Sequence, residues 1–328
     1  MRCRTAITVH HLRRQTNAAH LLKIIHFTLC IYKMPYMCYN KTVNINFGGN
    51  LMSYLIQYST LASKYDGPFG GGHPWISAGM GYLITTDDGH LIAIDGGHPA
   101  DTEAFIALIE ENSKDCTVDT WIVTHPHIDH YSVFFNTATR YPDRVKINKV
   151  VYRFPPDFKD SEGNGIADVV SDMEEALRVS GADHITPTAD DELYVGSSRI
   201  KFYFTPEDTS HIKGKNPLSL IFSVTVGKSR MMFTGDTWTE MLDSVLKKYG
   251  GELKSDFLQL PHHGLCDTGH DGFYKVVSPD TVLIPTSTAG YNAMNREEYA
   301  HATGDNKAVE AAASRVYKSF EGTVKIEL

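Results

Sequence analysis

Three imidazoles and a carboxylate fall within six consecutive residues of the chain: His125-Pro126-His127-Ile128-Asp129-His130. An apolar run, Trp121-Ile122-Val123, precedes them almost directly, and an apolar run followed by a Pro-containing polar segment is typical of a buried strand that ends in a loop. Imidazole nitrogens and carboxylate oxygens suit zinc, iron or manganese. On extended backbone His125 and His127 point to the same side and can bind one ion, while Asp129 and His130 reach a second. A solvated His-rich loop is the plainer alternative, but short His clusters usually bind metal.

A second carboxylate, Asp236, stands in the same kind of place. It follows the apolar run Met231-Met232-Phe233 through Thr234-Gly235, so it also leaves a strand end into a loop. Its two oxygens can bridge a pair of ions, which lie about 3.5–4 Å apart in two-metal sites. Asp236 could instead cap a helix that begins at Thr237, and both roles can hold together.

Paired imidazoles, His262 and His263, follow a third strand-like run in Leu260-Pro261-His262-His263-Gly264. One of the two is expected to complete the second ion beside Asp129 and His130. The other can then face a substrate and donate a hydrogen bond or a proton to a leaving oxygen.

The His-x-His-x-Asp-His spacing at 125–130 resembles the metal motif of the metallo-β-lactamase superfamily. The resemblance covers roughly residues 79–328 and implies an αββα sandwich. It favours His263 as the ligand, which leaves His262 as the catalytic residue. Most superfamily members have a third histidine about twenty residues before the Thr-Gly-Asp, where this chain has Asn216-Pro217-Leu218-Ser219. His211 or His301 could complete that ligand set, as could water.

The Asn216-x-x-Ser219 sequence at this point, together with Leu260-Pro261-His262-His263-Gly264, resembles one subgroup of the superfamily, which has Leu-x-x-His-His-Gly: the hydrolase domain of DNA-uptake competence channel proteins and related phosphodiesterases. The sequence therefore predicts a hydrolase with two divalent ions, zinc first and manganese or iron as alternatives. Asp129 would orient the attacking water, and the expected substrate is a phosphodiester. A lactone, thioester or other acyl bond is the alternative, and a di-iron redox protein or a non-catalytic metal-binding protein ranks lower. Absence of the usual third histidine also argues against an antibiotic-degrading lactamase.

The elements that must position these residues alternate along the chain. Strands are expected at 81–85, 90–94, 118–123, 149–153, 199–204, 218–226, 230–234, 257–260, 281–285 and 323–328, and helices from 101 or 102, at 131–139, 166–179, 237–249 and 305–315. Asp87-Asp88-Gly89 predicts a hairpin turn between the first two strands, and the glycines of Asp95-Gly96-Gly97 predict a tight turn beneath the site. Strands in two groups with interspersed helices fit two packed sheets flanked by helices, an α/β class.

Composition sets further limits on domains and partners. Residues 1–51 carry seven basic residues and no acidic one, and the rest of the chain carries 24 basic against 39 acidic residues, a net charge of −15. We expect a poorly ordered basic extension at 1–51 and a hydrolase domain at 52–328. No apolar run reaches 18 residues, and the five cysteines are scattered, so a cytoplasmic protein without a membrane span is predicted. Nucleic acid is a less favoured partner than a small-molecule or phosphodiester substrate, since the charge is acidic.

Overall fold

The computed structural model describes residues 52–67, 78–265, 270–297 and 300–328, with the side chains of 300–303 left out. The predicted extension at 1–51 and the side chain of His301 lie outside the described residues. Within them, no helix combines the length and the apolar character needed to cross a bilayer.

Two seven-stranded mixed sheets form the middle of the fold. The first has the order β16-β1-β2-β3-β5-β7-β8, with β3, β5, β7 and β8 parallel to one another and the remaining pairs antiparallel. Its strands are β1 (Tyr54–Gln57), β2 (Gly81–Thr85), β3 (Leu91–Asp95), β5 (Thr120–Ile122), β7 (Lys149–Val151), β8 (Asp183–Ile185) and β16 (Val324–Glu327).

The second sheet has the order β15-β14-β13-β12-β11-β10-β9, parallel from β12 to β15 and antiparallel from β9 to β12. Its strands are β9 (Glu192–Val195), β10 (Ser198–Phe204), β11 (Ile221–Val226), β12 (Ser229–Phe233), β13 (Phe257–Gln259), β14 (Thr281–Ile284) and β15 (Arg315–Lys318). A short parallel pair, β4 (Thr117–Val118) and β6 (Lys146–Ile147), lies apart from both sheets.

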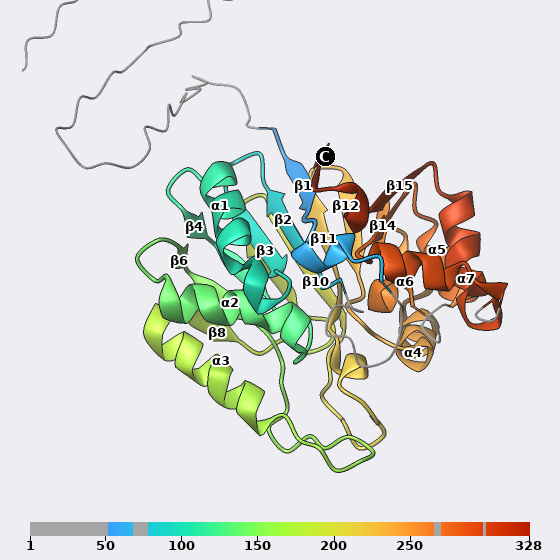
Figure 1. The fold of residues 1–328 in the computed structure, drawn as a ribbon, viewed down its shortest axis with the longest axis horizontal. Coiled ribbons are helices and arrows are strands. Elements are labelled where there is room, and N and C mark those ends of the chain that lie inside the picture. Colours follow the sequence, from blue (N-terminus) through green and yellow to red (C-terminus); the bar gives the residue numbers. More distant parts are fainter. Residues whose placement is uncertain (1–51, 68–77, 266–269, 298–299) are drawn as a thin grey trace, which may run out of the picture. The chain divides into compact units, whose positions relative to one another are not determined.

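Helices cover the outer faces of the two sheets, so the molecule has four layers, α/β/β/α (Figure 1). On the first sheet lie α1 (Thr102–Asn112), α2 (Ile128–Arg140) and α3 (Ala167–Ser180); on the second side lie α4 (Thr239–Tyr249), α5 (Asp271–Val277), α6 (Thr288–Met294) and α7 (Ala300–Ala312). Three apolar clusters fill the gaps between the layers. Strand β3 shows how one segment serves two of them: Leu91 and Ala93 face α1 and α2, while Ile92 and Ile94 face the second sheet. This alternation follows from the two-residue period of a strand.

The expected αββα fold is therefore confirmed, and the differences are local. Helix α2 begins at Ile128 rather than at 131, so Asp129 and His130 lie in its first turn. The predicted helix at 305–315 begins at 300, ends at Ala312 and gives way to strand β15. Strands β1, β6, β8, β9 and β15 and the short helices α5 and α6 were not predicted.

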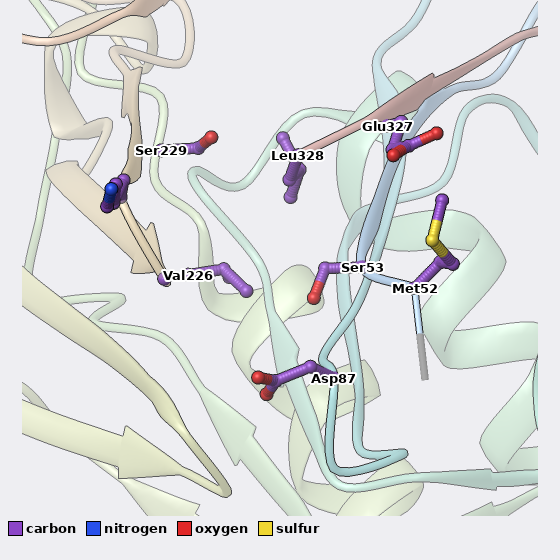
Figure 2. Close-up of a pocket in the computed structure, with 9 residues that line it drawn as sticks. Met52, Ser53, Asp87, Val226, Ser229, Glu327 and Leu328 are labelled. Atoms are coloured by element: carbon purple, nitrogen blue, oxygen red, sulfur yellow. The ribbon is translucent and has the colours of Figure 1, made fainter. Parts of the chain in front are cut away.

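Polar side chains gather at one edge of the two sheets. Strands β3 and β5 are parallel, as are β12 and β13, and each pair ends at that edge. Asp95 is the last residue of β3, and the 125–130 segment, Asp236 and His263 follow the ends of β5, β12 and β13. The opposite edge holds a cavity of about 480 Å³ between the start of β1, the β2–β3 turn, the β11–β12 turn and the C-terminus (Figure 2). Its lining includes Asp87, Lys228 and Glu327 but no histidine, so it does not resemble the predicted site.

Candidate metal centre

The 125–130 segment leaves β5 and turns at once into helix α2. His127 is the N-cap of the helix, with extended backbone, and Asp129 and His130 occupy the first turn. Nε2 of His125 and Nδ1 of His127 lie 3.0 Å apart, so both rings present a nitrogen to the same point. A carboxylate in the first turn is stabilised by the free backbone N–H groups and the positive end of the helix dipole. The sequence placed all four side chains in a loop, but two of them stand on a rigid helix.

His130 is fixed by a carboxylate that the sequence analysis treated only as part of a turn. Nδ1 of His130 donates to Oδ2 of Asp95 at 2.7 Å, and the same carboxylate accepts hydrogen bonds from the backbone N–H and the hydroxyl of Thr124 at 2.8 and 2.7 Å. Asp95 and His130 are fully buried. A histidine that donates one ring N–H to a carboxylate presents its other nitrogen as a ligand in a fixed orientation. Its position in the sequence could have indicated this role, because Asp95 is the last residue of a strand and Asp236 follows a strand end by three residues.

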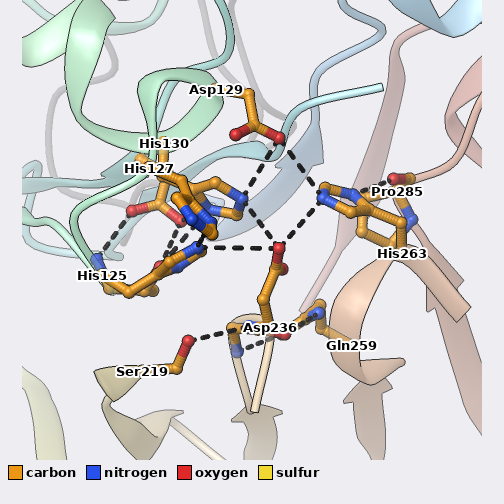
Figure 3. Close-up of polar contacts among 12 residues, drawn as sticks. His125, His127, Asp129, His130, Ser219, Asp236, Gln259, His263 and Pro285 are labelled. Atoms are coloured by element: carbon orange, nitrogen blue, oxygen red, sulfur yellow. Dashed lines mark hydrogen bonds and ion pairs between the residues drawn. The ribbon is translucent and has the colours of Figure 1, made fainter. Parts of the chain in front are cut away.

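Asp236 lies in the turn after β12. Gly235 has φ +55°, and a Cβ there would lie 2.7 Å from Oγ of Ser219, so a side chain is excluded. The Ser219 hydroxyl accepts a hydrogen bond from the Asp236 backbone N–H at 2.9 Å. This turn directs the carboxylate back toward the first sheet, where it meets the histidines of the 125–130 segment (Figure 3).

His262 and His263 both adopt left-handed backbone conformations, with φ of 47° and 57°. Their side chains point to different partners. His263 is buried, and its Nδ1 donates to the carbonyl of Pro285 at 2.7 Å. Its Nε2 therefore faces the carboxylates of Asp129 and Asp236. His262 turns away to Asn216, whose Nδ2 lies 3.0 Å from Nε2 of the ring. Asn216 thus contacts His262 rather than joining the His125 side of the cluster.

The described residues contain two groups of three side chains that could hold a metal ion. The first is His125, His127 and Asp236, and the second is Asp129, His130 and His263. Oδ2 of Asp236 lies 3.6 Å from Nε2 of His125, 3.3 Å from Nε2 of His130 and 3.2 Å from Nε2 of His263, so it faces both groups. Oδ2 of Asp129 completes the second group at 3.5 Å from His130 and 3.4 Å from His263.

All six residues predicted as ligands therefore lie together in these two groups, and their binding of metal stays a prediction. His211 is exposed and belongs to neither group. Its loop packs through Ile212 into the core, which leaves the histidine facing solvent.

The electrostatics of the cluster fit a cation. Burial alone would lower the pKa of His263, but Asp236 and Asp129 outweigh it and raise the pKa to about 10. Burial would raise the pKa of Asp236, yet His263, His130 and His125 hold that pKa well below its usual range. The cluster thus keeps positive charge between its carboxylates, which divalent ions can supply instead of protons.

Two further observations support the fit. Nε2 of His130 and Oδ1 of Asp236 are buried and make no hydrogen bond within the described residues, although buried polar atoms are nearly always paired. Burial, followed by the nearby His130, holds the pKa of His125 well below its usual range, so this ring is neutral, as a ligand must be.

Comparison with known proteins gives a family and a fold. The family model of the metallo-β-lactamase superfamily matches residues 77–264, more than half of the chain. Competence protein ComA of Neisseria gonorrhoeae is 32% identical over 89 residues, which are 27% of this chain and only 12% of that protein's length.

Two solved structures are similar over most of the chain. The metallo-β-lactamase fold protein YhfI of Bacillus subtilis is 14% identical, with a TM-score of 0.50, and covers 84% of this chain and 100% of its own. Zinc-bound PqqB of Methylobacterium extorquens is 11% identical, with a TM-score of 0.51 and the same coverage of both chains. At these identities the two structures establish a shared fold and nothing finer.

Proposed function

The chain belongs to the metallo-β-lactamase superfamily, and from that premise we propose that it is a metal-dependent hydrolase that cleaves a phosphodiester with two divalent cations, zinc in preference to manganese or iron. One observation carries the proposal. Oδ2 of Asp236 lies within 3.6 Å of ring nitrogens from both three-residue groups, which is where a carboxylate shared between two ions belongs.

The two groups divide the ligands evenly. His125, His127 and Asp236 would hold one cation, and Asp129, His130 and His263 the other. Cations bound there would lower the pKa of water toward neutrality, polarise a phosphoryl oxygen and offset the charge that develops in the transition state. The donor set of imidazole nitrogen and carboxylate oxygen suits zinc, iron and manganese, and it contains no thiolate.

Asp129 is the candidate residue for orienting the attacking water. Burial would raise its pKa, but His130 and His263 hold that pKa well below its usual range, so the carboxylate is ionised at neutral pH. An ionised carboxylate only accepts hydrogen bonds. It can therefore take a hydrogen bond from water while the helix α2 keeps it in place.

His262 is the candidate catalytic residue at the leaving group. Because the Asn216 amide donates to Nε2, the hydrogen of a neutral His262 ring resides on Nδ1. Nδ1 is buried and has no hydrogen-bond partner within the described residues. The ring thus has a free N–H to donate to a departing oxygen.

Three features favour a phosphodiester over an acyl bond. The chain resembles the hydrolase domain of competence proteins through Asn216-x-x-Ser219 and Pro261-His262-His263-Gly264, and it matches competence protein ComA over 89 residues. Lys215, next to Asn216, is close enough to lower the pKa of His127 after the larger effect of burial, so a cation borders the site. A phosphodiester carries the complementary negative charge. Nucleic acid remains the less favoured form of that substrate, because the chain from residue 52 is strongly acidic.

The test begins with the metal content of the purified full chain and continues with a substrate panel. We expect two zinc ions per chain and hydrolysis of bis-p-nitrophenyl phosphate at a higher kcat/KM than that of a lactone or a thioester. Single-stranded DNA in the same panel tests the nucleic-acid form. Faster turnover of the lactone or thioester would show that the substrate is an acyl compound rather than a phosphodiester. Oxygen consumption by iron-loaded protein in the presence of a reductant would show that the protein is a redox enzyme rather than a hydrolase.

A further inference from the structure

Gln259 is a fully buried amide at the end of β13 that contacts the turn carrying Asp236. Its Oε1 accepts hydrogen bonds from the backbone N–H groups of Thr234 and Gly235 at 2.8 and 2.9 Å. Its Nε2 donates to the carbonyl of Gly235 at 3.1 Å and to the carbonyl of Leu260. Figure 3 shows this side chain beside Asp236, below the histidines.

The pattern fits an amide and no other side-chain group. Two N–H donors and two carbonyl acceptors face the side chain, and a primary amide alone offers an acceptor and a pair of donors side by side. The orientation of the amide is thereby fixed, since the reversed amide would set its NH₂ against two N–H groups. The hydroxyl of Thr234 adds a further link, because it donates to the Gln259 backbone carbonyl at 3.0 Å.

The position of Gln259 relates these bonds to the site. Strands β12 and β13 pair in parallel through Met231 with Phe257 and Met232 with Leu258. Beyond this pairing the two segments lead to Asp236 and His263. The Gln259 side chain continues the cross-strand hydrogen bonding beyond this last pair. It joins the two turns where their carboxylate and imidazole must approach to 3.2 Å. The backbone N–H of His262 strengthens the same link by donating to the Gly235 carbonyl at 3.0 Å.

We propose that Gln259 is a positioning residue that sets the approach of Asp236 to His263 and so determines how tightly the site binds divalent cations. The proposal rests on the function proposed above, that these side chains hold cations. Gln259 belongs to neither three-residue group, and it acts through the backbone of residues 234–235.

The experiment measures zinc affinity of the full-length chain by competition with a chromophoric chelator, with zinc alone as the probe. Gln259→Met keeps the length of the side chain but removes every hydrogen bond that the side-chain amide makes. We expect zinc to bind about 10–100-fold more weakly, the range seen when groups that orient metal ligands are lost. The absorption spectrum of the cobalt-substituted protein should change as well, since it reports ligand geometry and not stability.

Gln57→Met is the matched control. Gln57 is also fully buried, but its amide contacts Tyr82 and Tyr317 and no residue of the site. Weaker zinc binding by Gln259→Met, with wild-type affinity in Gln57→Met, supports the proposal. An unchanged affinity in Gln259→Met, or an equal loss in both variants, overturns it.

A second variant decides the question if Gln259→Met does not accumulate as folded protein. Gln259→Glu still accepts from the two N–H groups but repels the carbonyls of Gly235 and Leu260. Added negative charge near the site would by itself strengthen cation binding. Weaker zinc binding by this variant would therefore show that displacement of the turn at residues 234–235 weakens the site. Equal or tighter binding overturns the proposal. A wild-type chain that binds no zinc would instead overturn the proposed function, so the two failures are distinguishable.

Discussion

The segment from His125 to His130 brings four polar side chains to the candidate metal centre from one strand end and one helix turn, whereas Asp236 and His263 arrive singly from the ends of β12 and β13. In the first region the chain itself sets the spacing of the ligands. In the second region hydrogen bonds set it: Ser219 holds the Asp236 backbone and the Pro285 carbonyl holds the His263 ring. From this difference we expect contiguous ligands to tolerate changes in their surroundings better than dispersed ones do. Substitutions in the two regions should test it.

Asp236→Ala should have the largest effect, because this carboxylate faces both three-residue groups. If the proposed function holds, its loss would leave each ion with fewer ligands and would remove the carboxylate shared between them. We expect the zinc content to fall at both positions and kcat/KM for bis-p-nitrophenyl phosphate to fall by at least about 10³-fold, since metal ions contribute several kcal/mol to such reactions. Elemental analysis and steady-state kinetics measure the two quantities.

The control for Asp236→Ala is Asp183→Ala, which removes an exposed carboxylate from β8. It should retain wild-type zinc content and turnover. If Asp236→Ala retains two zinc ions and its activity, Asp236 is not a ligand. The comparison between contiguous and dispersed ligands would then no longer hold for Asp236.

His127→Ala and His263→Ala test whether the two groups act separately. His127 belongs to the group with His125, and His263 to the group with Asp129 and His130. Each variant should lose one of two zinc ions, with turnover lowered by about 10²-fold or more, because each removes a ligand of a single ion. Zinc stoichiometry by mass spectrometry under native conditions distinguishes the species. Simultaneous loss of both ions from either variant would show that the groups form one indivisible site.

Asp95→Asn should have a smaller effect, because Asp95 acts through His130. An amide at this position is neutral and no longer draws the ring N–H as a carboxylate does. We expect zinc affinity to fall about 10–100-fold, as for other groups that orient a ligand. Ser219→Ala provides the dispersed counterpart, since it removes the acceptor for the Asp236 N–H. Zinc competition measures both, and a larger loss in Asp95→Asn than in Ser219→Ala would contradict the idea that the dispersed region depends more on its supports.

The same contrast explains how far the sequence could predict this structure. The 125–130 segment was recognisable because its ligands are neighbours, and the αββα layers followed from the alternation of apolar runs and from the resemblance that the segment carries. Asp236 and the pair His262-His263 were found because each follows a strand end within three or four residues, and the resemblance singled out His263 within the pair.

Groups that act across the fold could not be predicted in this way. Asp95 contacts His130 over a separation of 35 residues, and the strand β1 pairs with β16 at the other end of the chain. No local pattern encodes such partners, because they are set by the packing of the layers. The start of α2 was missed for a different reason: His127 caps the helix through its extended backbone and makes no side-chain cap hydrogen bond.

The smallest predicted effect is the dependence of metal-free stability on pH. The pKa of His263 lies at about 10 in the folded chain, above its ordinary value of 6.5, because Asp236 and Asp129 outweigh the effect of burial. A raised pKa gives stability that is complete below pH 6.5 and is lost as the pH rises toward 10. The melting temperature of the chelator-treated chain should therefore fall by several degrees across this window. The zinc-loaded chain should vary less, since zinc replaces the proton, and a metal-free chain whose melting temperature stays constant would show that Asp236 and His263 do not approach each other without the ion.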